Sequence, residues 1–186
     1  MDFYSIFKFL HVMSAIAWLG GGLTFFALAL MYGMRKDFAS LNSAVNHVAF
    51  LGPRWFVPTS LLTLMFGLMT TFLGNLWGDA WVVLGLFGFA GTFSTGLFAI
   101  KPLSEAIAAR NAEGRPDLAA PLGARIMQIS KFDYVLMALV IALMVLKPTW
   151  GDVLVLAIMA TVLVLAAVVF LGTGFKPADE QATPAE

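Results

Sequence analysis

Long apolar runs alternate with shorter polar segments along the chain, and this pattern predicts membrane-spanning helices. A spanning helix needs about 20 predominantly apolar residues. Five ranges reach or approach that length: 4–33, 55–75, 80–100, 132–147 and 152–173. The fourth range is short, but Leu122, Ile126 and Ile129 recur at helical spacing and predict that it extends backwards. We therefore expect an all-α, polytopic bundle of about five transmembrane helices.

The polar segments between these ranges predict how the bundle is connected. An amphipathic stretch at 39–50 bridges the first two spans, and a polar connection at 101–121 follows the third. Gly114, Pro116 and Pro121 are expected to interrupt helical structure in that connection. We expect residues 1–174 to form one helical bundle and residues 175–186 to form a disordered cytoplasmic tail, since the tail contains few apolar residues.

The composition agrees with a membrane protein. Hydrophobic residues make up 60% of the 186 residues and charged residues 12%, and the mean hydropathy is +0.89. Soluble domains are nearer half apolar and a quarter charged. The chain has no cysteine, which excludes disulfides, thiolate metal sites and thiol catalysis. We expect no removable signal peptide, because the N-terminus has no basic segment and no small-residue cleavage site.

The distribution of basic residues predicts the orientation in the membrane. Nine of the eleven Lys and Arg residues lie near the connections after the first and third spans or in the tail, and only Lys8 and Lys147 lie on the opposite side. Cytoplasmic loops are enriched in Lys and Arg, so we expect the N-terminus outside and the C-terminus in the cytoplasm of a bacterial inner membrane. Lipid is then the main environment, and nucleic acid is not an expected partner.

The most informative residue is His11, which lies inside the first apolar range and is one of two histidines. An ionisable group in a span is costly and usually functional, and neutral imidazole is a common metal ligand. Trp18 and the small residues from Gly20 to Gly22 follow it and would let a bulky group approach the helix. The alternative is a structural histidine that is hydrogen-bonded to a neighbouring helix.

A second ligand can be sought at the depth of His11. His47 should lie about 20 Å away in depth, at 1.5 Å per residue, and is better explained as a solvated residue. Counting from the helix ends places Met69, Met144 and Lys147 near the depth of His11, and methionine can ligate haem opposite histidine. An open sixth position is equally compatible with the sequence.

Two other features have both a functional and a structural interpretation. Arg54, at the cytoplasmic mouth of the second span, could bind a haem propionate or an anionic substrate, although such residues often reach lipid phosphate. Small residues recur every four positions from Gly88 to Gly96, which favours close helix packing and could also accommodate a porphyrin face. The ten methionines are scattered and favour packing over a copper site.

Several function classes are disfavoured by what these ranges lack. No Asp or Glu is expected in the middle of a span, whereas proton-coupled transporters and pumps normally have acidic relays there. The sequence contains no phosphate-binding glycine loop, no HExxH motif and no convincing hydrolase triad. A hydrolase or an ATP-driven device is therefore disfavoured.

The segment LHVMSAIAWLGG at 10–21 resembles the opening helix of a superfamily of small haem-associated membrane proteins. That superfamily includes HemJ-type protoporphyrinogen oxidases, CopD-type copper-resistance proteins and the membrane part of cytochrome-linked urate oxidases. In its pattern a histidine is followed seven residues later by tryptophan and then by small residues, here His11, Trp18, Gly20 and Gly21. PRWFVPTSLLTLMFGL at 53–68 and RIMQISKFDYVLMALVIALMVLKP at 125–148 resemble the second and fourth spans of HemJ.

The resemblance implies that His11 is an axial ligand of a b-type haem. HemJ proteins carry a lysine near the start of the third span, whereas Val83, Leu84 and Gly85 occupy the matching stretch here, which places the chain in a sister group. We expect a haem-binding protein with an electron-transfer or redox role, coupled to quinone or a periplasmic electron carrier. The alternatives are a HemJ-like porphyrinogen oxidase, CopD-like copper handling and a cofactor-free interaction subunit.

Overall fold

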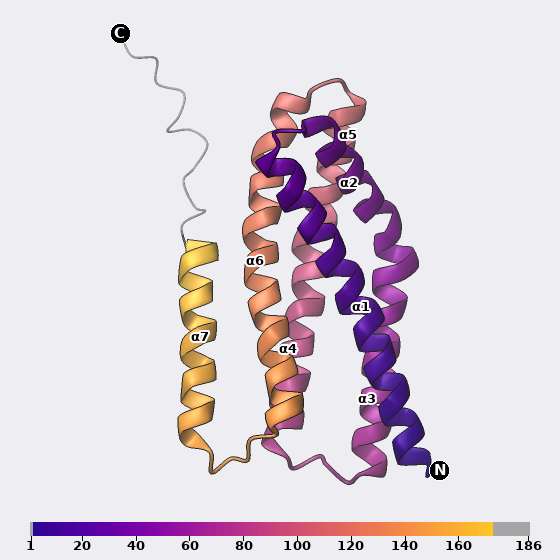
Figure 1. Ribbon diagram of the computed structural model, residues 1–186, viewed down its shortest axis with the longest axis vertical. Helices are drawn as coiled ribbons and strands as arrows, with labels where there is room; N and C mark the ends of the chain where they lie inside the picture. Colours follow the sequence, from indigo (N-terminus) through magenta and orange to yellow (C-terminus); the bar gives the residue numbers. More distant parts are fainter. Residues whose placement is uncertain (1, 173–186) are drawn as a thin grey trace.

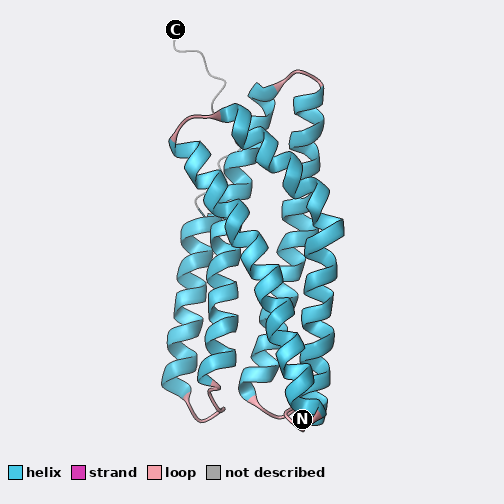
Figure 2. Cartoon of the chain, turned by 45° about the vertical axis from the view of Figure 1, so that its right-hand side comes forward, coloured by secondary structure: helices cyan, strands magenta, loops and turns pink. Residues whose placement is uncertain are grey.

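The computed structural model describes residues 2–172, and these residues form helices joined by short connections (Figures 1 and 2). In chain order the elements are α1 (Phe3–Met34), α2 (Phe38–Leu51), the π-helical turn η1 (Gly52–Phe56), α3 (Val57–Leu73), α4 (Ala80–Thr95), the π-helical turn η2 (Gly96–Ile100), α5 (Lys101–Ala112), α6 (Pro116–Leu146) and α7 (Val153–Leu171). The predicted all-α class is confirmed. The predicted disordered tail at 175–186 lies outside the described residues.

Five helices in the described part of the chain are long and apolar enough to cross a membrane, which confirms the predicted number. The second and third are longer than predicted, at Asn46–Leu73 and Ala80–Ala112. The helix interruption predicted at Gly114 and Pro116 is confirmed, because α5 ends at Ala112 and α6 begins at Pro116. The interruption predicted at Pro121 was wrong, because this residue lies inside α6, in its second turn, where its missing N–H removes one backbone hydrogen bond without ending the helix.

Two π-helical turns explain why the second and third spanning helices are continuous. In η1 the N–H of Val57 donates to the carbonyl of Gly52, and in η2 the N–H of Lys101 donates to the carbonyl of Gly96. Each turn begins at a glycine that is followed six residues later by a proline. A proline ring clashes with the carbonyl four residues before it, and a wider turn at that point relieves the clash without ending the helix.

The helices form two closely packed pairs, α1 with α3 and α4 with α6, and α7 packs on the outer side of α6 (Figure 1). Residue 3, the α3–α4 connection and the α6–α7 connection lie at one end of the bundle, which we call the N-terminal end. At the opposite end, α2 packs against α1 and α5, and α5 packs against α6. Side chains of the two pairs meet at Trp18 and Phe89, whose ring centroids are 5.5 Å apart, and at Phe26 and Tyr134, at 4.7 Å.

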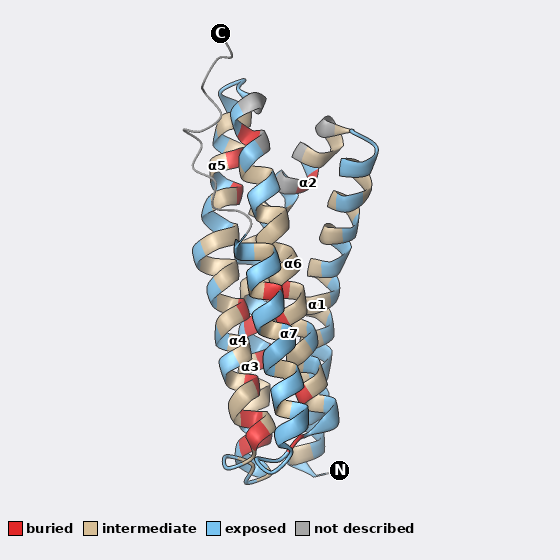
Figure 3. Ribbon diagram, turned by 90° about the vertical axis from the view of Figure 1, so that its left-hand side faces the viewer, coloured by how far each residue is buried: buried red, intermediate tan, exposed pale blue. Residues whose placement is uncertain are grey.

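Buried residues are few and lie along the inner faces of the helices, whereas most of α7 is exposed (Figure 3). Several of the buried side chains are small hydroxyls, as expected where helices approach closely in lipid. Ser60 Oγ and Thr63 Oγ1 donate to carbonyls of their own helix, Val57 O at 2.9 Å and Thr59 O at 2.8 Å. Gly88 also faces α6, since an added Cβ would meet Val140. The close helix approach predicted from Gly88 to Gly96 is therefore present at Gly88 but not at Gly96, where an added Cβ would meet nothing within 4 Å.

The α6–α7 connection is fixed by local hydrogen bonds. Lys147 ends α6 in the left-handed conformation (φ 48°), and its N–H donates to the carbonyl of Leu143 at 2.9 Å. The hydroxyl and the backbone N–H of Thr149 both donate to Oδ2 of Asp152 at 2.7 Å. These two hydrogen bonds hold the pKa of Asp152 below its ordinary value.

Candidate functional site

Two cavities lie between the α1–α3 pair and the α4–α6 pair. The larger, of about 410 Å³, is lined by residues of the N-terminal half of the bundle including His11, and we call it the His11 cavity. The smaller, of about 270 Å³, lies towards the opposite end and includes Asp133, and we call it the Asp133 cavity. Trp18, Thr92 and Met137 line both cavities and therefore separate them. Both volumes are near or within the range of small-molecule sites.

His11 lines the larger cavity and is held by a hydrogen bond from its ring. Nδ1 lies 2.8 Å from the backbone carbonyl oxygen of Thr63 on α3. A carbonyl can only accept, so Nδ1 is the protonated nitrogen and Nε2 of the neutral ring keeps its lone pair. This is the arrangement in which metal-ligating histidines are oriented by a second hydrogen bond. His11 can therefore act as a ligand through Nε2.

Gly67 makes room for the imidazole one helical turn beyond Thr63. An added Cβ at residue 67 would lie 2.9 Å from both Cε1 and Nδ1 of His11, closer than real Cβ contacts. Because of this clearance, α1 and α3 pack tightly at the depth of the ring and still allow the Nδ1 hydrogen bond. The position of His11 is thus set by two neighbours on α3.

Charged and soft side chains complete the His11 cavity. Lys8 and Lys147 line it and are exposed, with Lys8 Nζ 5.9 Å from the ring centroid of Tyr4 and Lys147 Nζ 5.2 Å from that of Trp81. Met144 also lines it. The structure therefore places a candidate ligand, a thioether and two cations around one apolar space.

The other residues proposed from the sequence lie elsewhere. Gly21 packs against η1, where an added Cβ would lie 3.1 Å from Trp55 Nε1. Arg54 is exposed, and its Nη1 donates to the carbonyl of Phe50 at 3.2 Å. Met69 is 38% exposed and does not line the His11 cavity. His47 is exposed on α2, as expected.

Asp133 corrects the prediction that no acidic residue lies in the middle of a span. It lies near the middle of the spanning part of α6, Pro121–Leu146, and is only 7% exposed. Its Oδ1 lies 2.5 Å from Thr95 Oγ1, which is also 2.8 Å from the carbonyl of Thr92. The prediction was wrong because it considered only the apolar range 132–147, in which Asp133 is the second residue, and not the backward extension that Leu122 and Ile126 predict.

Sequence reasoning missed Gly67, Thr63 and Lys8 as neighbours of the His11 cavity. Gly67 and Thr63 are ordinary residues of an apolar helix, and no sequence signal shows which face of α3 meets α1. Lys8 could have been found, because it lies three residues before His11 and three or four residues share a helical face.

Comparison with known proteins assigns the chain to a family. The family model described as predicted integral membrane protein (DUF2269) matches residues 5–148. The chain belongs to this family. No curated protein and no solved structure matches the chain. The matched range includes every residue lining the two cavities except Tyr4, and α7 lies outside it. Both cavities are therefore built from the part of the chain that defines the family.

Proposed function

We propose that the chain binds one b-type haem in the His11 cavity, with His11 Nε2 as an axial ligand, and has an electron-transfer role. The observation that supports this most is the His11 ring itself. It faces a cavity of about 410 Å³ inside a membrane bundle, and Nδ1 is committed to Thr63 O, which leaves Nε2 available.

The residues around the cavity suit a haem group. Haem would bring its own porphyrin nitrogen ligands for the iron, so a single protein ligand, His11, would be enough to hold it. This matters because the described residues contain no group of three or more His, Cys, Asp or Glu side chains that could hold a metal ion. Lys8 and Lys147 are cations that can pair with the haem carboxylates. Met144 is the candidate thioether for the other axial position.

When bound, haem supplies one-electron redox chemistry. The chain's contributions are to orient His11 through Thr63, to exclude water with apolar walls and to hold the carboxylates with lysines. A quinone or an electron carrier outside the membrane is the proposed partner. The predicted orientation, with the N-terminus outside, would place the His11 cavity nearer the outer face of a bacterial inner membrane.

The test is the haem content of the detergent-purified protein from haem-replete cells, with wild type compared with His11→Ala and His47→Ala. His47 is the matched control, because it is exposed and its Nδ1 bonds only its own helix, at Ser43 O. We expect a b-type spectrum in wild type and His47→Ala, and its loss in His11→Ala. A wild type without visible absorbance would reject the haem proposal, and copper in that protein would support CopD-like metal handling instead.

A HemJ-like porphyrinogen oxidase is the second candidate, and one observation favours it. Lys147 lines the same cavity as His11, so it could take the role of the lysine that the third span lacks. Lys147→Gln would then abolish oxidation of protoporphyrinogen. If wild type does not oxidise protoporphyrinogen, this second candidate is rejected and the electron-transfer proposal is unaffected.

A further inference from the structure

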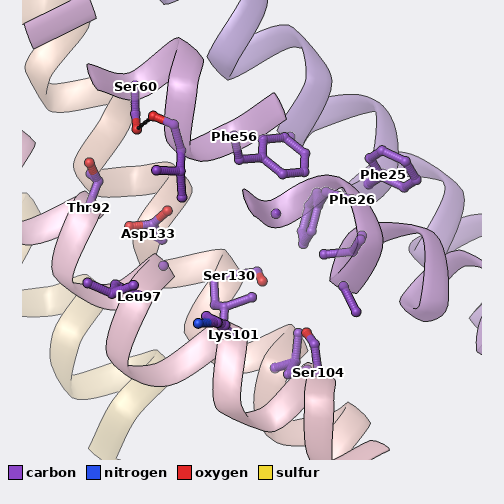
Figure 4. A pocket seen from close by; sticks show the side chains of 18 of the residues that line it. Phe25, Phe26, Phe56, Ser60, Thr92, Leu97, Lys101, Ser104, Ser130 and Asp133 are labelled. Carbon is purple, nitrogen blue, oxygen red and sulfur yellow. Dashed lines mark hydrogen bonds between the residues drawn. The ribbon is translucent and has the colours of Figure 1, made fainter. Parts of the chain in front are cut away.

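The Asp133 cavity has features that neither the haem proposal nor the packing of the bundle uses. Its walls are largely aromatic on one flank, where Phe25, Phe26 and Phe56 lie, and polar on the other (Figure 4). Aromatic walls of this kind accept a flat ring, since offset or edge-on ring contacts are favourable. The walls of the cavity are therefore suited to a ring-bearing molecule that dissolves in the membrane.

Asp133 supplies a buried hydrogen-bonding group at the side of this cavity. Its Oδ1 is engaged by Thr95, which leaves Oδ2 for another donor. The Thr95 hydroxyl has a single proton and two acceptors within reach, Asp133 Oδ1 and Thr92 O. Burying a carboxyl in a membrane bundle without a further partner is costly, and such residues usually mark a functional site. A ligand with a hydroxyl donor would satisfy this group.

The two π-helical turns border the same cavity. Gly52, Pro53 and Phe56 of η1, and Gly96, Leu97 and Ile100 of η2, are among its lining residues. Thr95, the partner of Asp133, immediately precedes η2. Single π turns within α-helices occur frequently at functional sites. Two of them on opposite helices of one cavity are an observation independent of the carboxyl.

The cavity has a charged mouth and adjoins the His11 cavity. Lys101 and Glu105 line it, form an ion pair at 3.8 Å and are 53% and 60% exposed. At its inner end it is separated from the His11 cavity by Trp18, Thr92 and Met137. A redox-active ring in this position would be one side-chain layer from the proposed haem.

We propose that the Asp133 cavity binds the headgroup of a quinol, with a ring hydroxyl donating to Asp133 Oδ2 and the ring against Phe26 and Phe56. The binding itself does not require haem, but its purpose rests on the proposed electron-transfer function. Oxidation of one quinol to a quinone would release two electrons, passed one at a time to the electron carrier outside the membrane, and two protons, released through the mouth at Lys101 and Glu105. The hydroxyl of a quinol matches the free acceptor, and its ring matches the aromatic flank.

The test is a fluorescence titration of the detergent-purified full chain with heptyl-hydroxyquinoline N-oxide, a quinol analogue. We expect saturable binding to wild type. Asp133→Leu removes the acceptor and should weaken binding about 10- to 100-fold, the usual loss when a buried donor is left without its partner. Asp133→Asn keeps one acceptor oxygen, which can serve either Thr95 or the quinol hydroxyl but not both, and should retain only part of the affinity. Glu113→Gln, in an exposed ion pair with Arg110 and outside the lining of the cavity, is the control and should change it less than about twofold.

Ala49→Phe provides a second variant that removes no polar group. Ala49 lines the cavity from α2, so a phenyl ring there should fill the space and abolish binding in a protein that still folds. His11→Ala should lose haem and keep analogue binding, which separates this proposal from the haem proposal. Equal affinity in wild type and Ala49→Phe, or no saturable binding to wild type, would overturn the quinol site.

Discussion

Gly67→Ala is the substitution whose effect can be worked out most directly from the geometry. The added Cβ would lie 2.9 Å from Cε1 and Nδ1 of His11, whereas ordinary van der Waals contact begins at 3.4 Å. The ring must therefore move by about 0.5 Å, or α1 and α3 must separate by a similar distance. The hydrogen bond from Nδ1 to Thr63 O is 2.8 Å long, and such bonds weaken beyond about 3.2 Å.

The expected cost follows from the role of that hydrogen bond. Loss of the group that orients a ligating histidine typically lowers metal affinity about 10- to 100-fold, which corresponds to about 1.4 to 2.7 kcal/mol of binding free energy. Folding should not suffer equally, because alanine is favoured over glycine in a helix by about 1 kcal/mol. The Gly67→Ala variant should therefore fold and bind haem more weakly than wild type.

The assay is haem titration of the haem-free protein, followed by the absorbance of the bound form. Gly20→Ala is the matched control, since it gains the same helix propensity and an added Cβ there meets nothing within 4 Å. We expect wild-type haem affinity in Gly20→Ala and an affinity lower by at least about tenfold in Gly67→Ala. Equal affinities in the two variants would refute the assigned position of the His11 ring.

Three further predictions follow from other parts of the bundle. Thr95→Val removes the hydrogen-bond partner of the buried Asp133 and should lower stability by about 1–3 kcal/mol, seen as a lower Tm in detergent; an unchanged Tm would show that this contact contributes nothing. Because the chain lacks cysteine, Gly78→Cys and Ala112→Cys can report its orientation in the membrane. An impermeant thiol reagent should label Gly78→Cys and not Ala112→Cys in intact cells. The reverse labelling would show that the N-terminus lies in the cytoplasm. The carboxyl of Asp152 has a lowered pKa, so the stability that it contributes is present above about pH 4 and is lost as the pH falls through the folded-state pKa. Hydrogen exchange in the α6–α7 turn, corrected for intrinsic rates, should therefore rise on acidification in wild type. The same exchange should be insensitive to acidification in Asp152→Asn.

The fold could be predicted from the sequence because apolar runs of membrane length leave few alternatives to helices. Depth along the membrane could also be counted, and Met144 and Lys147 do line the cavity that contains His11. Met69 shows where counting fails. Depth does not give rotation about the helix axis, and the exposed position of Met69 follows from which face of α3 packs on α1.

Helix boundaries limited the rest of the prediction. Asp133 was missed because only the apolar range from residue 132 was searched for acidic residues, although the helical spacing of Leu122 and Ile126 already predicted a longer helix. In the span Pro121–Leu146 the carboxyl lies near the middle. The predicted second and third spans, 55–75 and 80–100, begin or end within η1 and η2, whereas both helices continue through these turns. The Asp133 cavity lies between these turns, so it could be recognised only once both helices were seen to continue.

The central claim, that His11 Nε2 ligates a haem, is tested most directly by replacing the side chain with free imidazole. His11→Gly leaves a space beside Gly67 and Thr63 into which imidazole can diffuse. We expect the reduced-minus-oxidised difference spectrum of the haem-loaded wild type to be lost in His11→Gly and to be restored by added imidazole. A His11→Gly spectrum identical to wild type without imidazole, or wild-type protein that takes up no haem, would contradict it.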